Sequence, residues 1–231
     1  MMPASSAVRV SNYRYVRLGA IFYVSTLQYF LIQFLVSLRW SPPYSLSRNT
    51  ISDLGNTSCA RFSGRYVCSP LHSLMNLSFV LLGLTMIGGS LLVCRYLPTV
   101  RLLTVGFVSI ALGGVGAMMV GLFPENTIPA LHGIGASLPF LVGNIGLLLV
   151  GLSLAGPAAL RVYSVASGLI ALIFLVFYAT SHFLGFGEGG IERVVAYPQT
   201  VWLIVFGIYV TVWKSNSDVS LVKSSTTTSP N

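Results

Sequence analysis

Polar side chains gather in one short stretch of an otherwise apolar chain, Asn49-Thr-Ile-Ser-Asp-Leu-Gly-Asn56. The stretch combines a carboxylate, a glycine and several hydroxyl and amide groups, in a protein with only five acidic residues. Ser52-Asp53-Leu54-Gly55 fits a turn in which the aspartate accepts hydrogen bonds from backbone N–H groups and the glycine takes a positive φ. Two interpretations stay open: Asp53 stabilises this turn, or it contacts a ligand.

The three histidines would lie at a similar depth in the membrane. His72 and His132 begin two apolar runs, and His182 lies near the end of a third. Three imidazoles together with the Asp53 carboxylate could hold a zinc ion with one position open for water, which is the arrangement of a hydrolytic zinc site. The alternative is that the histidines hydrogen-bond to helix ends and loops, because their spacing contains no local ligand pair such as His-x-x-x-His.

Three more polar side chains would lie near the same membrane face. His72 and Asn76 are four residues apart and share one face of a helix. Arg193 could pair with Asp53 or bind a phosphate headgroup, because its planar guanidinium suits both. Hydrogen bonding between helices is the alternative role for these groups. The candidate ligand-binding residues are Asp53, His72, Asn76, His132, Glu192 and Arg193.

Six apolar runs must position these residues. The chain of 231 residues is 54% hydrophobic and 8% charged, with a mean hydropathy of +0.80, whereas a soluble domain has about 25% charged residues. Each run approaches the roughly 20 residues that span a bilayer, and backbone groups in hydrocarbon must be satisfied within the segment. The sequence therefore predicts an all-α bundle of six transmembrane helices, approximately Leu18–Leu38, Leu71–Val93, Leu102–Phe123, His132–Leu154, Tyr163–Leu184 and Thr200–Trp213.

Basic residues that flank the runs predict the orientation. Eight lie on the side of the two termini and five on the other side, so the positive-inside rule places both termini in the cytoplasm of a cell-membrane protein. The net charge of +8 then reflects topology and contact with anionic lipids. Because no basic cluster exists, nucleic acid is not an expected partner. The predicted organisation is a cytoplasmic arm 1–17, a membrane domain 18–213 and a disordered cytoplasmic tail 214–231.

Residues 39–70 would form a long outer loop between the first two spans. Long loops are usually functional or disordered, and the prolines, aromatic residues and low repetition of this one favour an ordered loop. Cys59 and Cys68 both lie in it. Because disulfides persist on the oxidising side of a membrane, we expect a Cys59–Cys68 bridge. Many glycines in the third and fourth spans predict close helix packing.

The polar stretch and its surroundings resemble a known family. Asn49-Thr-Ile-Ser-Asp-Leu-Gly-Asn-Thr-Ser-Cys59, followed by Arg65-Tyr-Val-Cys-Ser-Pro-Leu-His72 and Met75-Asn76, is similar to the domain of unknown function 998 family of multi-pass membrane proteins. Glu192-Arg193 with Tyr197-Pro198 also fits that pattern. The resemblance covers roughly residues 16–213. It implies a bacterial or archaeal membrane protein without an established activity, and it favours the six candidate residues as a polar centre.

Three functions are compatible with these features. We expect an integral membrane protein that binds a lipid or other amphiphile in a polar pocket at the outer leaflet, with Arg193 and the loop amides at the polar end. Membrane lipids are then its partners. One alternative is a metal-dependent hydrolase of a lipid ester or amide, with zinc as its cofactor, held by His72, His132, His182 and Asp53. The other is a structural or regulatory membrane subunit without a ligand.

Overall fold

The computed structural model describes residues 4–96, 100–154 and 156–212, and the side chains of residues 14–95 within the first of these ranges. The predicted tail 214–231 and the first residues of the arm 1–17 lie outside this part of the chain. Within it, six helical segments are long and apolar enough to cross a membrane. They are Arg14–Ser37, His72–Arg95, Arg101–Leu122, Pro129–Ser153, Ala158–Ala179 and Gly187–Val212. The prediction of six helices that are long and apolar enough to span a membrane is confirmed, while the side on which the termini lie stays a prediction.

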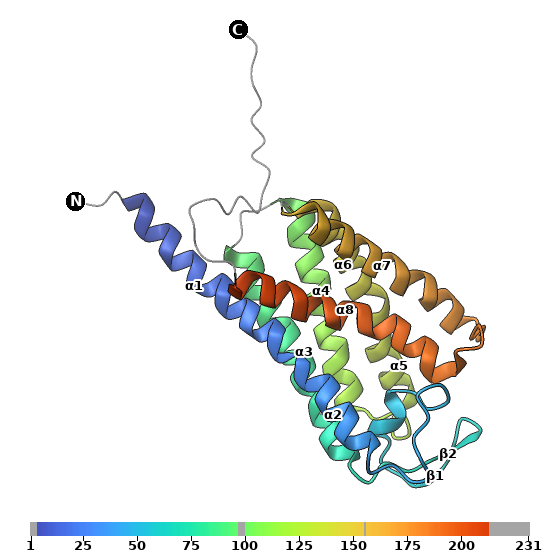
Figure 1. Ribbon diagram of the computed structural model, residues 1–231. Coiled ribbons are helices and arrows are strands. Elements are labelled where there is room, and N and C mark those ends of the chain that lie inside the picture. The colour runs from blue at the N-terminus through green and yellow to red at the C-terminus, as the bar shows by residue number, and fades with distance from the viewer. Residues whose placement is uncertain (1–3, 97–99, 155, 213–231) are drawn as a thin grey trace.

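Some spans consist of more than one helix. Thr26 separates the first two helices but keeps helical dihedrals, with φ −61° and ψ −13°, so together they form one span. The long helices lie side by side, and the start of α1 and the end of α8 lie at the end of the bundle opposite to the loop (Figure 1). The helices are α1 (Ala4–Ser25), α2 (Leu27–Ser37), α3 (His72–Tyr96), α4 (Arg101–Leu122), α5 (Pro129–Ser137), α6 (Asn144–Ser153), α7 (Ala158–Ala179) and α8 (Gly187–Val212).

The fourth and sixth spans depart from a regular helix over the predicted ranges, for clear physical reasons. In the fourth, a π-helix, η2 (Leu138–Gly143), joins α5 to α6. It contains Pro139, whose missing N–H and bulky ring disrupt regular α-helical hydrogen bonding. The sixth begins at Gly187 rather than at Thr200. Its first turns carry Glu188, Glu192 and Arg193, which lower the hydropathy without preventing a helix.

The loop between α2 and α3 is folded and includes a small β-hairpin. It contains a 3₁₀ helix, η1 (Ser52–Gly55), and two antiparallel strands, β1 (Ala60–Phe62) and β2 (Arg65–Val67). The expected Cys59–Cys68 disulfide closes this hairpin at its base. The all-α prediction is thus correct for the membrane domain and misses two short strands in the loop. We refer to the end of the bundle that carries residues 38–71 as the loop end.

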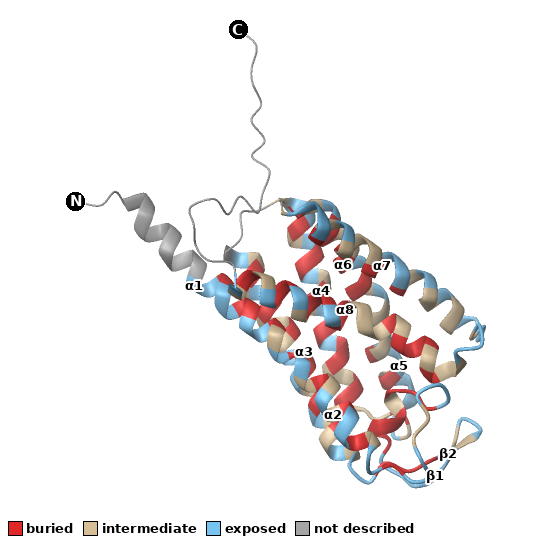
Figure 2. Cartoon of the chain, in the orientation of Figure 1, coloured by how far each residue is buried: buried red, intermediate tan, exposed pale blue. Residues whose placement is uncertain are grey.

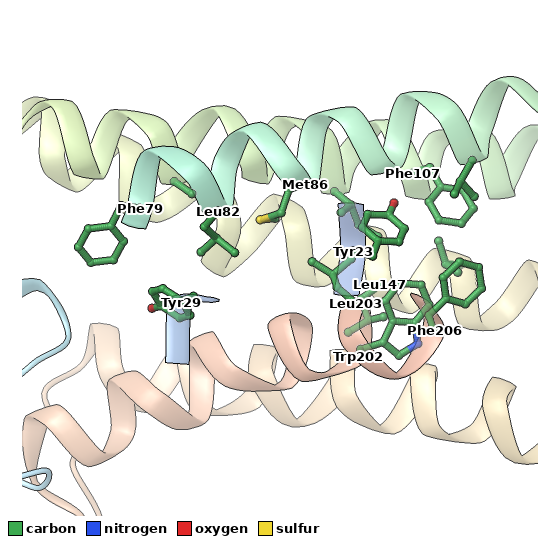
Figure 3. Close-up of a cluster of buried hydrophobic side chains, with 14 of the residues drawn as sticks. Tyr23, Tyr29, Phe79, Leu82, Met86, Phe107, Leu147, Trp202, Leu203 and Phe206 are labelled. Atoms are coloured by element: carbon green, nitrogen blue, oxygen red, sulfur yellow. The ribbon is translucent and has the colours of Figure 1, made fainter. Parts of the chain in front are cut away.

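Aromatic and aliphatic side chains fill the space between the helices. Trp202 stacks on Phe206 with ring centroids 4.8 Å apart, and Tyr23 and Phe107 contact the same ring from neighbouring helices (Figure 3). The outward faces carry many exposed apolar residues, among them Phe34 on α2, while buried residues line the inward faces (Figure 2). Apolar outward faces are what a bundle in a bilayer presents to lipid.

Glycines let neighbouring helices approach closely, as predicted. A Cβ atom placed on Gly83 of α3 would lie 2.3 Å from the carbonyl oxygen of Gly114 on α4. Gly106 of α4 approaches Gly146 of α6 in the same way: a Cβ atom placed on Gly106 would lie 3.0 Å from the carbonyl oxygen of Gly146. Small residues at contacts of this kind are typical of membrane helices.

Candidate functional site

The polar stretch folds into a turn with reciprocal hydrogen bonds. The backbone N–H of Asp53 donates to Thr50 Oγ1 at 3.0 Å, and the N–H of Thr50 donates to Asp53 Oδ2 at 3.0 Å. This is the exchange found in a capping box. It starts η1 and buries Asp53 completely. Asp53 thus accepts a bond from a backbone N–H, as the turn interpretation predicted. The positive φ predicted for Gly55 is wrong, because Gly55 is the last residue of η1 and keeps a negative φ.

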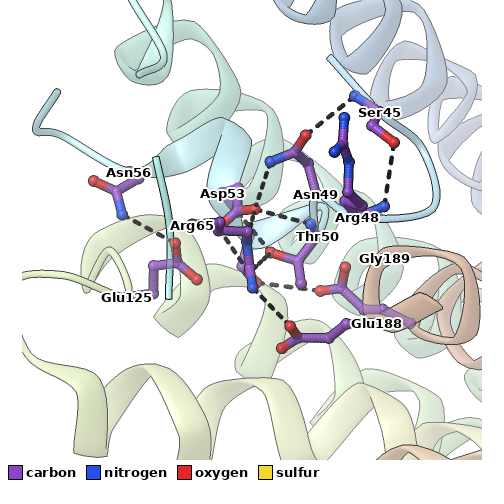
Figure 4. Close-up of polar contacts among 12 residues, drawn as sticks. Ser45, Arg48, Asn49, Thr50, Asp53, Asn56, Arg65, Glu125, Glu188 and Gly189 are labelled. Carbon is purple, nitrogen blue, oxygen red and sulfur yellow. Dashed lines mark hydrogen bonds and ion pairs between the residues drawn. The ribbon is translucent and has the colours of Figure 1, made fainter. Parts of the chain in front are cut away.

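Arg65 of β2 neutralises the buried carboxylate. Its Nε and Nη2 atoms donate to the two oxygens of Asp53 at 2.7 and 3.0 Å, and its Nη1 donates to Glu188 at 2.6 Å (Figure 4). A bidentate pair between a guanidinium and a carboxylate is among the strongest polar contacts in proteins. Because Glu188 lies in α8, Arg65 links the hairpin, η1 and the last helix.

Arg193 bonds to the loop backbone and not to Asp53. Its Nη1 donates to the carbonyl oxygens of Leu46, Asn49 and Gly189 at 2.7–3.0 Å, and its Nη2 donates to the Tyr44 hydroxyl. Burial raises the pKa of Tyr44, so the phenol stays protonated and donates to the Thr50 carbonyl at 2.8 Å. The expected pairing of Arg193 with Asp53 is wrong, because Arg65 occupies that position.

Glu192, Ser52 and His132 form a chain of contacts at the loop end of the bundle. Glu192 accepts the N–H of Ile51, and its Oε1 lies 3.3 Å from Ser52 Oγ. Ser52 Oγ lies 3.0 Å from His132 Nε2, and His132 Nδ1 lies 2.9 Å from the Phe123 carbonyl oxygen. Three segments distant in sequence, η1, α5 and α8, thus meet at one hydroxyl group.

A third buried carboxyl group, that of Glu125, joins the loop to the turn between α4 and α5. Glu125 accepts from Asn56 Nδ2 at 3.0 Å (Figure 4). Burial and the nearby charge of Asp53 raise the pKa of Glu125 to about 8, against the opposing effect of the Asn56 hydrogen bond. At neutral pH this carboxyl is therefore largely protonated.

The other predicted residues have separate positions. Asn76 donates to the Gly55 carbonyl at 2.9 Å, His72 bonds to the Ser69 carbonyl at 2.9 Å, and exposed His182 bonds to the Thr180 carbonyl at 2.8 Å. The described residues contain no group of three or more His, Cys, Asp or Glu side chains that could hold a metal ion. The structure thus does not bring the predicted zinc ligands together, because each histidine bonds to a different segment.

A cavity of about 50 Å³ lies beneath the loop, inside the bundle. Its walls are mostly apolar, and polar groups of Ser52, Glu192, Gln199 and Thr200 line it. The Gln199 side chain is 3% exposed, and its Nε2 has no hydrogen-bond partner. The apolar walls are formed mainly by Ile51, Phe79, Leu82, Met86, Ala117, Val120, Ala136, Pro139, Phe140 and Ala196.

Of the six predicted ligand-binding residues, Glu192 lines this cavity. Asp53, Asn76, His132 and Arg193 instead hold the loop against the bundle through the contacts described above. Sequence reasoning missed Arg65 as the partner of Asp53, although Ser63-Gly64 between two short β-prone segments is a hairpin signal that could have placed it. It also missed Ser52 and Gln199, whose residue types carry no signal of their own in an apolar chain.

Comparison with known protein families gives a match over most of the chain. The family described as Protein of unknown function (DUF998) matches residues 24–209, a range that includes the loop, the contacts of Arg65 and Arg193, and every residue that lines the cavity. No curated protein and no solved structure matches the chain significantly.

Proposed function

Since the chain belongs to the DUF998 family of proteins of unknown function, we propose from its own geometry that it binds a single-chain amphiphile within the membrane. The polar end of this molecule lies in the cavity, at Ser52, Glu192 and Gln199. The orientation predicted from the basic residues places this end at the outer leaflet.

One observation carries the proposal: Gln199, whose buried amide donor has no hydrogen-bond partner, lines a cavity inside an apolar bundle. A buried donor that makes no hydrogen bond costs about 1–3 kcal/mol. A ligand acceptor at Gln199 Nε2 would remove that cost. The volume of about 50 Å³ admits a small polar group with the first atoms of a chain. Ala136, Pro139 and Phe140 are half-buried, so we place the rest of the chain on their side of the bundle.

The charges of the residues that line the cavity favour an amphiphile whose polar end is uncharged. Glu192 is the only carboxyl group among the residues lining the cavity, and none of those residues is lysine or arginine. Arg193, expected to bind a phosphate headgroup, instead donates to backbone carbonyls and to Tyr44. Because none of the lining residues is a lysine or arginine that could neutralise a phosphate beside Glu192, the preferred ligand carries a hydroxyl, ester or amide group.

The lipids that co-purify with the protein test this proposal. We would extract the full chain directly from membranes into polymer-bounded discs and compare its lipids with the bulk membrane by mass spectrometry. One neutral single-chain lipid should be enriched. Ala117→Leu, which fills the cavity, and Gln199→Leu, which removes the amide, should each lower that enrichment at least fivefold.

Ala158→Leu is the matched control, because Ala158 is exposed at the start of α7 and does not line the cavity. This variant should retain the enriched lipid. Wild-type protein whose lipids match the bulk membrane would contradict the proposal, and so would an Ala117→Leu variant that keeps the lipid.

A further inference from the structure

We propose that Ser52 and His132 form a nucleophile and general-base pair that cleaves an acyl ester at the polar end of the cavity. The ester is that of the amphiphile assigned to the cavity above, so the inference rests on the proposed function and adds a reaction to it.

The distances suit this role. Ser52 Oγ lies 3.0 Å from His132 Nε2, within the range in which a base takes the proton of a nucleophile. On the other side of the ring, Nδ1 lies 2.9 Å from the Phe123 carbonyl oxygen. A carbonyl oxygen only accepts, so Nδ1 carries the proton and a neutral His132 has its lone pair on Nε2, facing Ser52. A base oriented by a third group is the usual arrangement of activated serines.

The position of Ser52 connects this pair to the cavity. Ser52 lines the cavity directly. His132 is 8% exposed and is not among the lining residues, so it contacts Ser52 from outside the cavity. The hydroxyl is fixed at the first residue of η1, which the Thr50–Asp53 exchange and the Asp53–Arg65 ion pair hold in place. A nucleophile on a rigid turn between its base and a binding cavity needs little rearrangement before it reacts.

Glu192 provides a second acceptor for the same hydroxyl proton. Ser52 can donate to His132 Nε2, or it can donate to Glu192 Oε1, which lies 3.3 Å from Ser52 Oγ. In the second state the contact between Ser52 and His132 persists only if Nε2 also carries a proton. Glu192 is thus placed to stabilise the charge that His132 acquires when it takes the proton of Ser52. Its contact is to Ser52, whereas the catalytic aspartate of serine hydrolases bonds to its histidine directly.

The reaction balances with water as the second substrate. Ser52 Oγ attacks the ester carbonyl carbon while its proton moves to His132 Nε2. The bond between the carbonyl carbon and the alcohol oxygen then breaks, and the leaving alcohol takes that proton. Water next attacks the acyl-serine, giving its hydroxyl to the acyl group and its proton, through His132, back to Ser52 Oγ. The unpartnered Gln199 Nε2 is a candidate donor to the carbonyl oxygen during both attacks.

A long-chain alkyl fluorophosphonate tests the nucleophile directly. Such a probe forms a covalent bond with an activated serine and releases fluoride. We would treat the full chain in membrane discs, digest it and identify the modified peptide by mass spectrometry. Modification should occur at Ser52. His132→Gln should slow the modification at least about 100-fold, the lower range of general-base effects. Its melting temperature should not fall far enough for unfolding to explain the slower reaction.

Ser58→Ala provides the control, because exposed Ser58 lies in the same loop and bonds to Asn56 Oδ1 at 3.1 Å. This variant should be modified at the wild-type rate. Folded wild-type protein with no modification at Ser52 overturns the inference, and so does a His132→Gln variant that reacts as fast as the wild type. Because the modified serine is identified in the wild-type chain, the result does not depend on whether Ser52→Ala folds.

The two proposals fail in different ways. If a lipid is enriched but Ser52 does not react, the lipid-binding proposal stands and the inference is overturned. If Ser52 reacts but no lipid is enriched, the result supports Ser52 as a nucleophile and contradicts the proposal that the protein retains a lipid during purification. If the protein hydrolyses a monoacylglycerol ester and leaves the ether analogue intact, the acyl chemistry is supported.

Discussion

Asp53 is a fully buried carboxylate near a membrane, and its neighbours compensate for its burial. It accepts hydrogen bonds from Thr50, Asn49 and Arg65, so both of its oxygens have partners. Removing a charge from water costs several kcal/mol, and only a well-placed partner with further hydrogen bonds offsets that cost. Arg65 supplies both the charge and two of the bonds.

Arg65→Ala should therefore destabilise the protein by about 3–5 kcal/mol, because it leaves Asp53 buried without a counter-charge. Adding Asp53→Asn to this variant should recover part of the loss. Arg61→Ala, at an exposed position of the same hairpin, should change stability by less than about 0.5 kcal/mol. Chemical unfolding in mild detergent measures all three variants. Equal effects of Arg65→Ala and Arg61→Ala would contradict the role of the ion pair.

Glu125 should make stability depend on pH. Its pKa of about 8 in the folded protein exceeds the ordinary 4.5, so the fold favours the protonated form. The contribution of Glu125 to the free energy of unfolding is complete below about pH 4.5 and is lost as the pH rises through 8. The slope reaches at most about 1.4 kcal/mol per pH unit between these values. Glu125→Gln keeps an acceptor for Asn56 without the titration, so it should remove this slope. An unchanged slope in the variant would refute the assignment.

At the residue level, sequence reasoning found the right region but not the right pairs. Asp53, Glu192 and Arg193 were recognisable because ionisable groups are rare in an apolar chain. Their partners were not, since Arg193 is satisfied by backbone carbonyls that every residue possesses. Arg65, the partner of Asp53, lies in a hairpin whose position against η1 depends on the tertiary fold. Which polar groups meet is a property of tertiary structure.

At the level of helices, close packing depends on single glycines. Gly83 of α3 and Gly133 of α5 form a matched pair, because a Cβ on Gly83 would lie 2.3 Å from a backbone oxygen, whereas one on Gly133 would meet nothing within 4 Å. Gly83→Ala should push α3 away from α4 and cost about 1–3 kcal/mol. Gly133→Ala should be neutral or stabilise by up to about 1 kcal/mol through helix propensity. Melting temperatures in detergent distinguish the two, and similar losses would argue against the close contact.

Hydropathy predicted all six spans because each must cover the thickness of a bilayer. It misplaced the start of α8, where the charged residues that contact the loop lie within the helix itself. It also predicted that the fifth span extends to Leu184, although α7 ends at Ala179 and a turn follows. Polarity marks the limits of hydrocarbon contact and not the limits of a helix, so helix ends near the membrane surface are the least predictable.

For the whole molecule, the orientation predicted from the basic residues can be tested with two single-cysteine substitutions at opposite ends of the bundle. Exposed Ser63 lies at the hairpin turn, and exposed Arg101 begins α4 at the other end. In intact cells a membrane-impermeant maleimide should label Ser63→Cys, and it should label Arg101→Cys only after permeabilisation. The parent chain would carry Cys94→Ser, since Cys94 is the free cysteine. The reverse labelling pattern would show that the termini face outward.

The contacts between the loop and α8 also constrain how the chain can be made. The N–H of Ile51 bonds to Glu192, a residue 141 positions later. A ribosome adds about 5–20 residues per second, so on the order of ten seconds separates the synthesis of these two partners. Until α8 emerges, the loop lacks Glu188, Glu192 and Arg193 and cannot reach its final form. Nascent chains that stop before Gly187 should therefore be recognised as unfinished by quality-control proteases, even with five spans already inserted.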